Sequence, residues 1–279
     1  YASREGKKEG IKSDDTVTLA FVGIVASLVG SRLLHLLMVE RDAFFADPGI
    51  FLQFSKGGYA FYGGFLLAFP ALMLVSRIKK VSFLQIADNM TPGMALGLAF
   101  GRTGCLLAGC CHGRPVGAPL PQWLLSVIPV KWPEWFALTF PSESGGLGSL
   151  PDQALVPTQP MSGLYSIGIF LFLALWLRPR KRYHGQILVW FCITYAFCRS
   201  TVELFRGDDR GLYMGEALST SQLVSVPVVV IGVAILLWAR SRIQAGKSQP
   251  LAEDWKEQGV AALEKATTPA RGKVRRRKR

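Results

Sequence analysis

The chain has 279 residues, half of them are hydrophobic, and its mean hydropathy is positive. Charged residues make up only 18% of the chain and gather in short clusters and near its end, which excludes a soluble domain with one large core. The formal net charge of +13 does not point to nucleic acid, because the basic residues bracket apolar segments, as they do in cytoplasmic loops. The composition predicts a polytopic membrane protein of the all-α class.

Six apolar runs have a length close to the roughly 20 residues that a helix needs to cross a bilayer. They cover residues 17–39, 58–76, 84–111, 161–177, 185–205 and 220–239. The third run contains Pro92 and several glycines, so a kink or a break is expected within it. The pattern therefore predicts about six transmembrane helices.

The loops between these runs alternate in charge. Residues 1–16, 77–80 and 178–182 and the chain after 240 are rich in Lys and Arg, whereas residues 40–57, 112–160 and 207–219 are poor in them. Because basic loops face the cytoplasm, both visible ends of the chain are expected there. No signal peptide is visible, and the chain opens with Tyr1.

Three regions follow from this organisation. Residues 1–16 form a polar cytoplasmic segment, residues 17–240 form the transmembrane domain, and residues 241–279 form a basic tail expected to be disordered near anionic lipid. Within the domain, the loop 112–160 is expected to form a small extracytoplasmic cap. Its many aromatic residues fit an interfacial belt, a cap over a lipid-facing cavity, or both.

Ionisable side chains lie within or at the ends of the apolar runs. They are Arg32, His35, Asp88, Arg102, Arg199, Glu203 and Arg206. Arginines outnumber carboxylates, and a buried charge without a partner is costly, so the excess predicts an anionic ligand such as a phospholipid headgroup. Structural pairing with snorkelling to the interface is the alternative. Glu203 shares a helix face with Arg199 and Arg206 and can neutralise one of them.

Glycines adjoin two candidate binding segments. Arg102 lies in GRTG between Gly101 and Gly104, where the missing side chains let a ligand approach the backbone. The other segment is KGGYAFYGGF (56–65), in which Tyr62 precedes Gly63 and Gly64. Either close helix packing or a thin wall with a phenol facing a cavity explains that second motif.

The cysteines fall into two groups. They are Cys105, Cys110, Cys111, Cys192 and Cys198, and none lies in a zinc-ribbon or paired CxxC pattern. Cys192 and Cys198 lie in an apolar run and are expected to be small buried hydrophobic residues. The first three lie close to Arg102 and His112. Cys110, Cys111 and His112 could hold a metal, but neighbours on one helix point in different directions and no second spaced ligand set exists, so no metal site is expected there.

Six segments, in the same order along the chain, resemble motifs of the prolipoprotein diacylglyceryl transferase family. They are GSRLLHLL (30–37), GGYAFYGG (57–64), ADNMTPGMALGLAFGRTGCLLAGCCHGRP (87–115), VPTQPMSGLY (156–165), CRSTVELFRGDD (198–209) and SQLVSVPVVVIG (221–232). The resemblance implies a multi-pass protein of the bacterial inner (plasma) membrane with seven helices. Residues 1–16 match the loop after the family's first helix, so that helix is expected to be missing from this sequence.

The resemblance also implies a reaction and its partners. A diacylglyceryl group moves from phosphatidylglycerol to the lipobox cysteine thiol beside a prolipoprotein signal peptide, among membrane lipids and without a cofactor or nucleic acid. The family's signature arginine falls on Arg102 and its later essential arginine on Arg206. Both are expected to bind the phosphodiester, since arginine forks suit phosphate. The residues expected to contact substrate around them are Gly101, Gly104, Cys105, Arg32, Glu203, Gly63 and Gly64.

The chain departs from the family pattern at positions that carry acid–base and amide groups. Tyr62 and Val156 replace histidines, Cys105 and Ala108 replace asparagines, and Cys110 and Ser166 replace glutamates. Tyrosine is a poor base at neutral pH, although Tyr62 holds the position of a catalytic histidine.

The residues that remain near Arg102 leave several hypotheses open. His112 is a candidate base, and Cys110 is a candidate nucleophile or thiol carrier, because a thiol beside Arg and His can ionise. Alternatively, these side chains only fill a groove. The corresponding alternative functions are a non-catalytic lipid-binding paralogue, or a related lipid transferase with another acceptor that uses Cys105, Cys110, Cys111 and His112.

Overall fold

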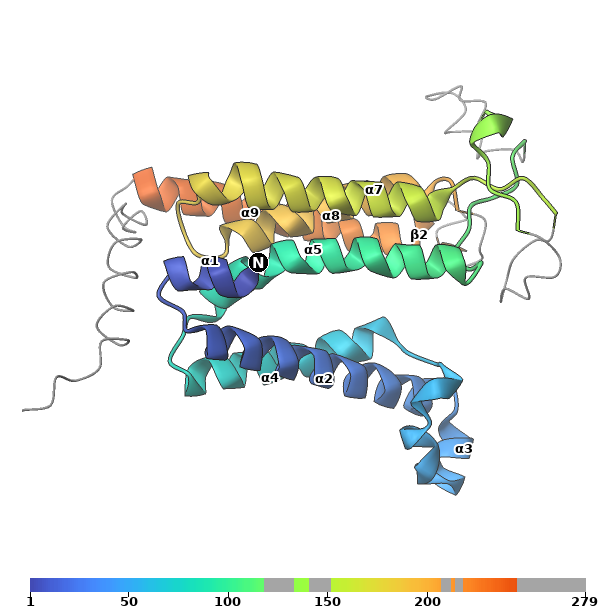
Figure 1. The fold of residues 1–279 in the computed structure, drawn as a ribbon, viewed down its shortest axis with the longest axis horizontal. Coiled ribbons are helices and arrows are strands. Elements are labelled where there is room, and N and C mark those ends of the chain that lie inside the picture. The colour runs from blue at the N-terminus through green and yellow to red at the C-terminus, as the bar shows by residue number, and fades with distance from the viewer. Residues whose placement is uncertain (118–132, 141–151, 207–211, 214–217, 245–279) are drawn as a thin grey trace, which may run out of the picture. The chain divides into compact units, whose positions relative to one another are not determined.

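The computed structural model describes residues 1–117, 133–140, 152–206, 212–213 and 218–244. These residues are mostly helical (Figure 1). The expected all-α class needs one small correction, because β1 (Leu212–Tyr213) pairs with β2 (Leu218–Ser219) as an antiparallel ladder. The chain divides into two compact units, one containing Tyr1–Met90 and the other Thr91–Pro250.

The first unit is built on two long helices, α2 (Ser13–Met38) and α4 (Phe61–Ile78), which lie side by side (Figure 1). The short helix α1 (Ala2–Lys8) precedes them. Between them lie α3 (Arg41–Ala46) and the 3₁₀ turns η1 (Pro48–Leu52) and η2 (Phe54–Lys56). Its buried core contains Ile11, Leu19 and Ile86.

Glycines bring α2 and α4 into close contact. A methyl group on Gly30 would overlap the carbonyl oxygen of Gly63, and a methyl on Gly63 would overlap that of Gly30. A methyl on Gly64 would lie 2.7 Å from Oγ of Ser27. Small residues allow two helix backbones to approach in this way.

The described residues of the second unit include four long helices. These are most of α5 (Phe83–Leu107), then α7 (Thr158–Leu171), α8 (Gln186–Glu203) and α9 (Thr220–Gln244). A π-helical segment η5 (Phe172–Leu177) and a 3₁₀ turn η6 (Arg178–Arg180) extend α7, and η3 (Glu134–Phe136) is a short turn. Helix α8 packs against both α7 and α9. The buried core includes Ala95, Ile169 and Leu173.

Each predicted apolar run falls on a helix of the structure, but two boundaries differ. The third run continues through Pro92 as one unbroken helix, so the expected break is not present there. Helix α5 also ends at Leu107, before Cys110 and Cys111, which the run had included. A glycine with positive φ, Gly109 at +63°, explains that end, because such a residue stops a helix.

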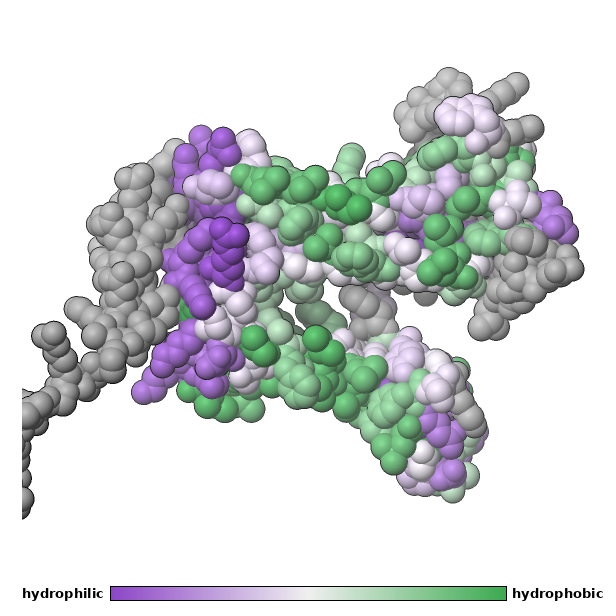
Figure 2. Space-filling model, in the orientation of Figure 1, coloured by the Kyte–Doolittle hydropathy of each residue, from purple (hydrophilic) through white to green (hydrophobic). Residues whose placement is uncertain are grey.

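Apolar side chains remain exposed along the helices. Figure 2 shows hydrophobic residues over the sides of α2 and α4, and hydrophilic residues around α1. Among the described residues, Ser13–Met38 and Thr158–Arg180 are long and apolar enough to span a membrane, while Tyr62–Ile78 and Ser225–Ser241 are shorter apolar helices. The number of crossings stays a prediction.

The expected cap and tail fall only partly within the structure. Residues 118–132 and 141–151 of the cap and 245–279 of the tail lie outside the described residues. The described parts of the cap are tied together by bridges that join Leu155 to Pro115 and to Leu138. Trp135 is exposed.

Candidate functional site

Arg102 lies in the wall of a pocket of about 280 Å³ between α5 and α7. Residues between Leu96 and Leu106 on α5 and between Gln159 and Ile167 on α7 line this pocket, and most of them are apolar. At Gly163 the two helices come close, since a methyl there would lie 4.0 Å from Cβ of Arg102. The result is a narrow apolar hollow with one guanidinium at its edge.

The charge of Arg102 has no protein counterpart in the part of the chain that the structure describes. Its side chain is half-buried, and the described residues offer it neither a hydrogen bond nor an ion pair. Tyr165 of α7 interacts electrostatically with both Arg102 and Arg199. Since a cation beside apolar surface is costly without a partner, this arrangement favours an anion in the pocket.

Arg206 has different surroundings, because a carboxylate accompanies it. Nε of Arg206 lies 3.8 Å from Oε2 of Glu203, which also forms an ion pair with Nη1 of Arg199. Arg206 is 6% exposed. Arg199 and Glu203 lie one turn apart in α8, but the helix ends at Glu203 and Arg206 follows it, so the expected shared helix face does not include Arg206. Glu203 contacts two arginines rather than one.

A tight turn after α5 brings three cysteines together. The amide of Cys110 donates to the carbonyl of Cys105 (3.1 Å) and that of Gly109 donates to Leu106 (3.2 Å), which is the Schellman pattern of helix ends. That pattern places the residue after the glycine beside the last helical turn. Cys111 then reverses direction with φ +62°. The sulfur atoms of Cys105, Cys110 and Cys111 all lie within 4.8 Å of one another.

This turn is fixed by hydrogen bonds from the start of α7. Oγ1 of Thr158 donates to the carbonyl of Cys111 (2.9 Å), and Nε2 of Gln159 donates to that of Cys110 (3.0 Å). Both side chains are buried. The expectation that Cys110, Cys111 and His112 are neighbours on one helix is wrong, because α5 ends at Leu107 and the chain turns at Gly109 and Cys111.

Gly113 and Arg114, which follow the cysteine turn, are hydrogen-bonded to the segment before α7 and to the segment after α8. The amide of Gly113 donates to Val156 (3.0 Å), and the amide of Arg114 donates to Phe205 (3.0 Å). Nη2 of Arg114 also donates to the carbonyl of Leu204 (2.9 Å). These bonds join the segment after α5 to the segment just before α7 and to the segment just after α8 that contains Arg206.

His112 and Cys110 differ in how well they suit their expected roles as base and nucleophile. Nδ1 of buried His112 lies 3.0 Å from the carbonyl of Gly113. A carbonyl only accepts, so Nδ1 carries the proton in this contact and Nε2 is the basic nitrogen. Burial, followed by the neighbouring thiols of Cys111 and Cys105, raises the pKa of Cys110 to about 11. Cys110 is thus protonated near neutral pH, which argues against it as the nucleophile.

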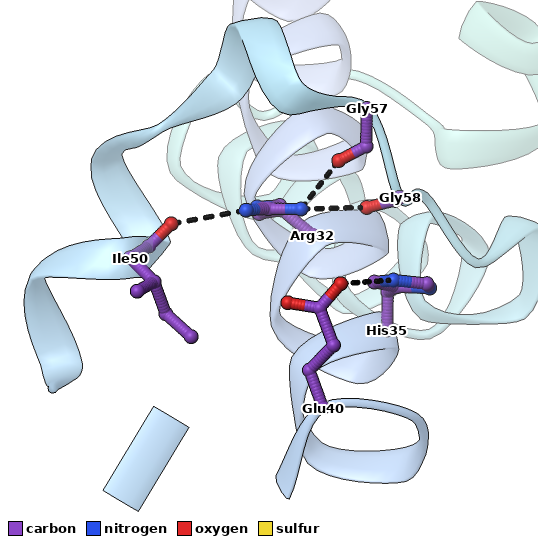
Figure 3. Close-up of polar contacts among 6 residues, drawn as sticks. All are labelled: Arg32, His35, Glu40, Ile50, Gly57 and Gly58. Carbon is purple, nitrogen blue, oxygen red and sulfur yellow. Dashed lines mark hydrogen bonds and ion pairs between the residues drawn. The ribbon is translucent and has the colours of Figure 1, made fainter. Parts of the chain in front are cut away.

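Arg32 is enclosed by backbone carbonyls in the first unit (Figure 3). Its Nη1 donates to Gly57 and to Gly58 (3.2 Å), and its Nη2 donates to Ile50 (3.0 Å). Only 2% of the residue is exposed. In the same view His35 contacts Glu40 at 3.3 Å. This geometry ties the loop between α3 and α4 to α2.

The glycines expected to contact substrate, and Tyr62 at the position of the family's histidine, have distinct environments. Gly63 and Gly64 face α2, as described above, which supports the packing explanation of their motif. Tyr62 is 52% exposed. Gly101 and Gly104 are exposed, and methyl groups there would meet no described atom within 4 Å. Packing therefore does not account for the two glycines beside Arg102.

Comparison with known proteins decides the family. The family model described as prolipoprotein diacylglyceryl transferase matches residues 1–238, which is most of the chain. The chain belongs to the prolipoprotein diacylglyceryl transferase family. Membership makes it a transferase of lipoprotein biosynthesis and implies a polytopic membrane protein.

Curated relatives carry the same activity in their names. A phosphatidylglycerol–prolipoprotein diacylglyceryl transferase of Ralstonia pickettii is 33% identical, over 86% of this chain and 82% of its own length. The enzyme of the same name from Burkholderia cenocepacia is 34% identical, over 84% of this chain and 81% of its own length. The phosphatidylglycerol–prolipoprotein diacylglyceryl transferase 2 of Clostridium perfringens is 28% identical, over 88% of this chain and 86% of its own length.

Several residues that build this candidate site were not among those expected from the sequence. Gln159 and Thr158 fix the cysteine turn, Arg114 holds the end of α8, and Tyr165 interacts with Arg102. Thr158 and Gln159 belong to the VPTQ segment that resembles a family motif, so that motif was the available signal. Arg114 and Tyr165 also lie in segments that resemble family motifs, 87–115 and 156–165, but their contacts join distant segments, which a motif does not reveal.

Proposed function

We propose that this enzyme transfers a diacylglyceryl group from phosphatidylglycerol to the lipobox cysteine thiol of a prolipoprotein. It acts as a multi-pass protein of the bacterial inner membrane, in which the six long helices of the described residues, α2, α4, α5, α7, α8 and α9, cross the bilayer. Membership in the family and the names of the relatives support the reaction. The observation that carries the site is Arg102, a half-buried cation beside an apolar pocket and without a protein counterpart among the described residues.

The reaction needs an anion-binding group next to apolar surface. The sulfur of the acceptor attacks the glycerol carbon, the carbon–oxygen bond to phosphate breaks, and glycerol phosphate leaves with the bonding electrons. Negative charge grows on the phosphate as the bond breaks. Arg102 offers a planar fork of donors that stabilises this charge, while the pocket accepts acyl chains.

Arg206 and His112 take supporting roles in this proposal. The ion pair with Glu203 orients Arg206 and reduces its net charge, so Arg206 assists at the phosphate while Arg102 makes the main contact. The acceptor thiol must lose its proton to become the nucleophile. Nε2 of His112 is the basic nitrogen that the turn after α5 provides. Tyr62 replaces the family's histidine but belongs to the first unit.

A transfer assay tests the proposed function. The full chain is placed in vesicles that contain phosphatidylglycerol, with a peptide that spans a lipobox, and the diacylglyceryl adduct is measured by mass spectrometry. We expect wild-type protein to form the adduct and Arg102→Ala to lose at least about 100-fold in rate, as removal of a key charge-stabilising donor does. Arg77→Ala is the matched control, because Arg77 is exposed at the end of α4.

Two results would favour the other functions. Protein that binds phosphatidylglycerol but forms no adduct with any peptide would indicate a non-catalytic lipid-binding paralogue. Release of glycerol phosphate without lipidation of the peptide would indicate a transferase with another acceptor. Full activity of Arg102→Ala would contradict the role assigned to Arg102.

A further inference from the structure

Three thiols at the end of α5 have the spacing of a metal site. Their sulfur atoms lie within 4.8 Å of one another. A metal–sulfur bond of about 2.3 Å requires thiolates roughly 4 Å apart, so small side-chain rotations suffice to close such a site. A disulfide would need a larger movement, since its sulfurs are only about 2 Å apart, and it would use two of the three thiols.

The backbone holds this arrangement in place before any ligand binds. The Schellman turn sets Cys110 beside Cys105, and the positive φ of Cys111 directs its chain back toward them. Buried Thr158 and Gln159 hold the carbonyls of the turn from α7. Supporting hydrogen bonds of this kind are what orient the ligands of metal sites.

The donor set selects the kind of ion. Thiolates prefer soft or borderline ions, and Zn²⁺ and Cu⁺ are the common ions that accept sulfur ligands with low coordination numbers. The described residues place no carboxylate in the sulfur cluster, so hard ions such as Mg²⁺ and Ca²⁺ do not fit it.

We propose that Cys105, Cys110 and Cys111 bind one thiophilic d¹⁰ metal ion, Zn²⁺ or Cu⁺, through three thiolate sulfurs. Each thiol gives its proton to water as its metal–sulfur bond forms, and no electron is transferred. The ion fastens the turn after α5 to the helix that carries Arg102. For Zn²⁺, three protein ligands leave a fourth position for a water or an external thiol.

Metal content of the purified full chain tests this proposal. The protein in detergent is loaded separately with Zn²⁺ and with Cu⁺ under reducing conditions, passed over a desalting column, and measured by elemental mass spectrometry. We expect about one ion per chain for at least one of the two metals. Single variants Cys105→Ser, Cys110→Ser and Cys111→Ser are expected to lower retention at least about tenfold.

Matched controls separate this site from the other thiols and from misfolding. Cys198→Ser removes a cysteine of α8 and is expected to keep full loading. Bound metal is also expected to protect the three clustered cysteines of the wild-type chain from reaction with maleimide, measured by peptide mapping. This measurement uses the wild-type chain, so it does not depend on whether a variant folds.

Three outcomes would overturn the proposal. The first is wild-type protein that retains neither metal, and the second is loading that all three cluster variants leave unchanged. The third is a disulfide within the cluster that persists under the reducing conditions and excludes metal. These measurements use no lipid or peptide substrate, so their failure would leave the proposed transferase reaction intact.

Discussion

Arg102 and Arg32 show how the surroundings of a guanidinium decide its role. Arg32 donates to three backbone carbonyls and is 2% exposed, so its donors are used within the protein. Arg102 is half-buried beside a pocket, and no described residue bonds to it. A phosphate therefore has access to the donors of Arg102, whereas at Arg32 it would have to displace protein carbonyls.

The role of Arg32 is tested by its removal. Arg32→Met leaves three part-buried carbonyls without their donor, and a fully buried unsatisfied group costs about 1–3 kcal/mol. We expect the melting temperature in detergent to fall by roughly 5–10 °C. Arg41→Met, a change at an exposed arginine, is the control. An unchanged melting temperature together with loss of phosphatidylglycerol binding would show instead that Arg32 binds lipid.

The thiol of Cys110 gives a pH-dependent prediction. Because burial and neighbouring thiols raise its pKa to about 11, its reactive thiolate is rare at pH 7 and grows with pH. In metal-free full chain, we expect the rate of maleimide addition at Cys110 to rise about tenfold per pH unit from pH 7 to 10. Peptide mapping measures the rate, with glutathione as the control thiol. A plateau below pH 9 would contradict the raised pKa.

Helix packing in the first unit depends on glycines that face each other. Gly63→Ala puts a methyl group against the carbonyl of Gly30, and such overpacking costs about 1–3 kcal/mol. We expect a melting temperature roughly 3–10 °C lower. Gly97→Ala is the matched control, because α5 has open space at Gly97 and alanine favours a helix. Equal stability of the two variants would exclude close packing at Gly63.

The sequence was sufficient to locate the helices, because an apolar run of fixed length is a local property of the chain. It was not sufficient to predict that a turn after α5 brings the three cysteines together, although the sequence contains a signal for the end of the helix. Gly109 lies near the end of the predicted run 84–111, and glycine is a typical helix stop, so it was a signal for a helix end near Leu107. The loop carbonyls that surround Arg32 are non-local backbone groups, which no pattern of residue types reveals.

At the scale of the whole molecule, the proposed crossings predict which loops lie on each side of the membrane. Alkaline phosphatase, which is active only outside the cytoplasm, is fused after residues 54, 140 and 213 and after residues 80 and 182. Because basic loops stay inside, we expect activity from the first three fusions only. Comparable amounts of each fusion protein are the control. Activity after residue 80 or 182 would contradict six crossings.

The central claim is that the pocket beside Arg102 holds a phospholipid by its phosphate. Phosphatidylglycerol with a photoreactive acyl chain is irradiated with the full chain in vesicles, and the labelled peptides are mapped by mass spectrometry. We predict label on residues 96–106 and 159–167, loss of that label in Arg102→Ala, and competition by phosphatidylglycerol but not by diacylglycerol, which lacks the phosphate. Label spread evenly over the helices, or unchanged in Arg102→Ala, would contradict the claim.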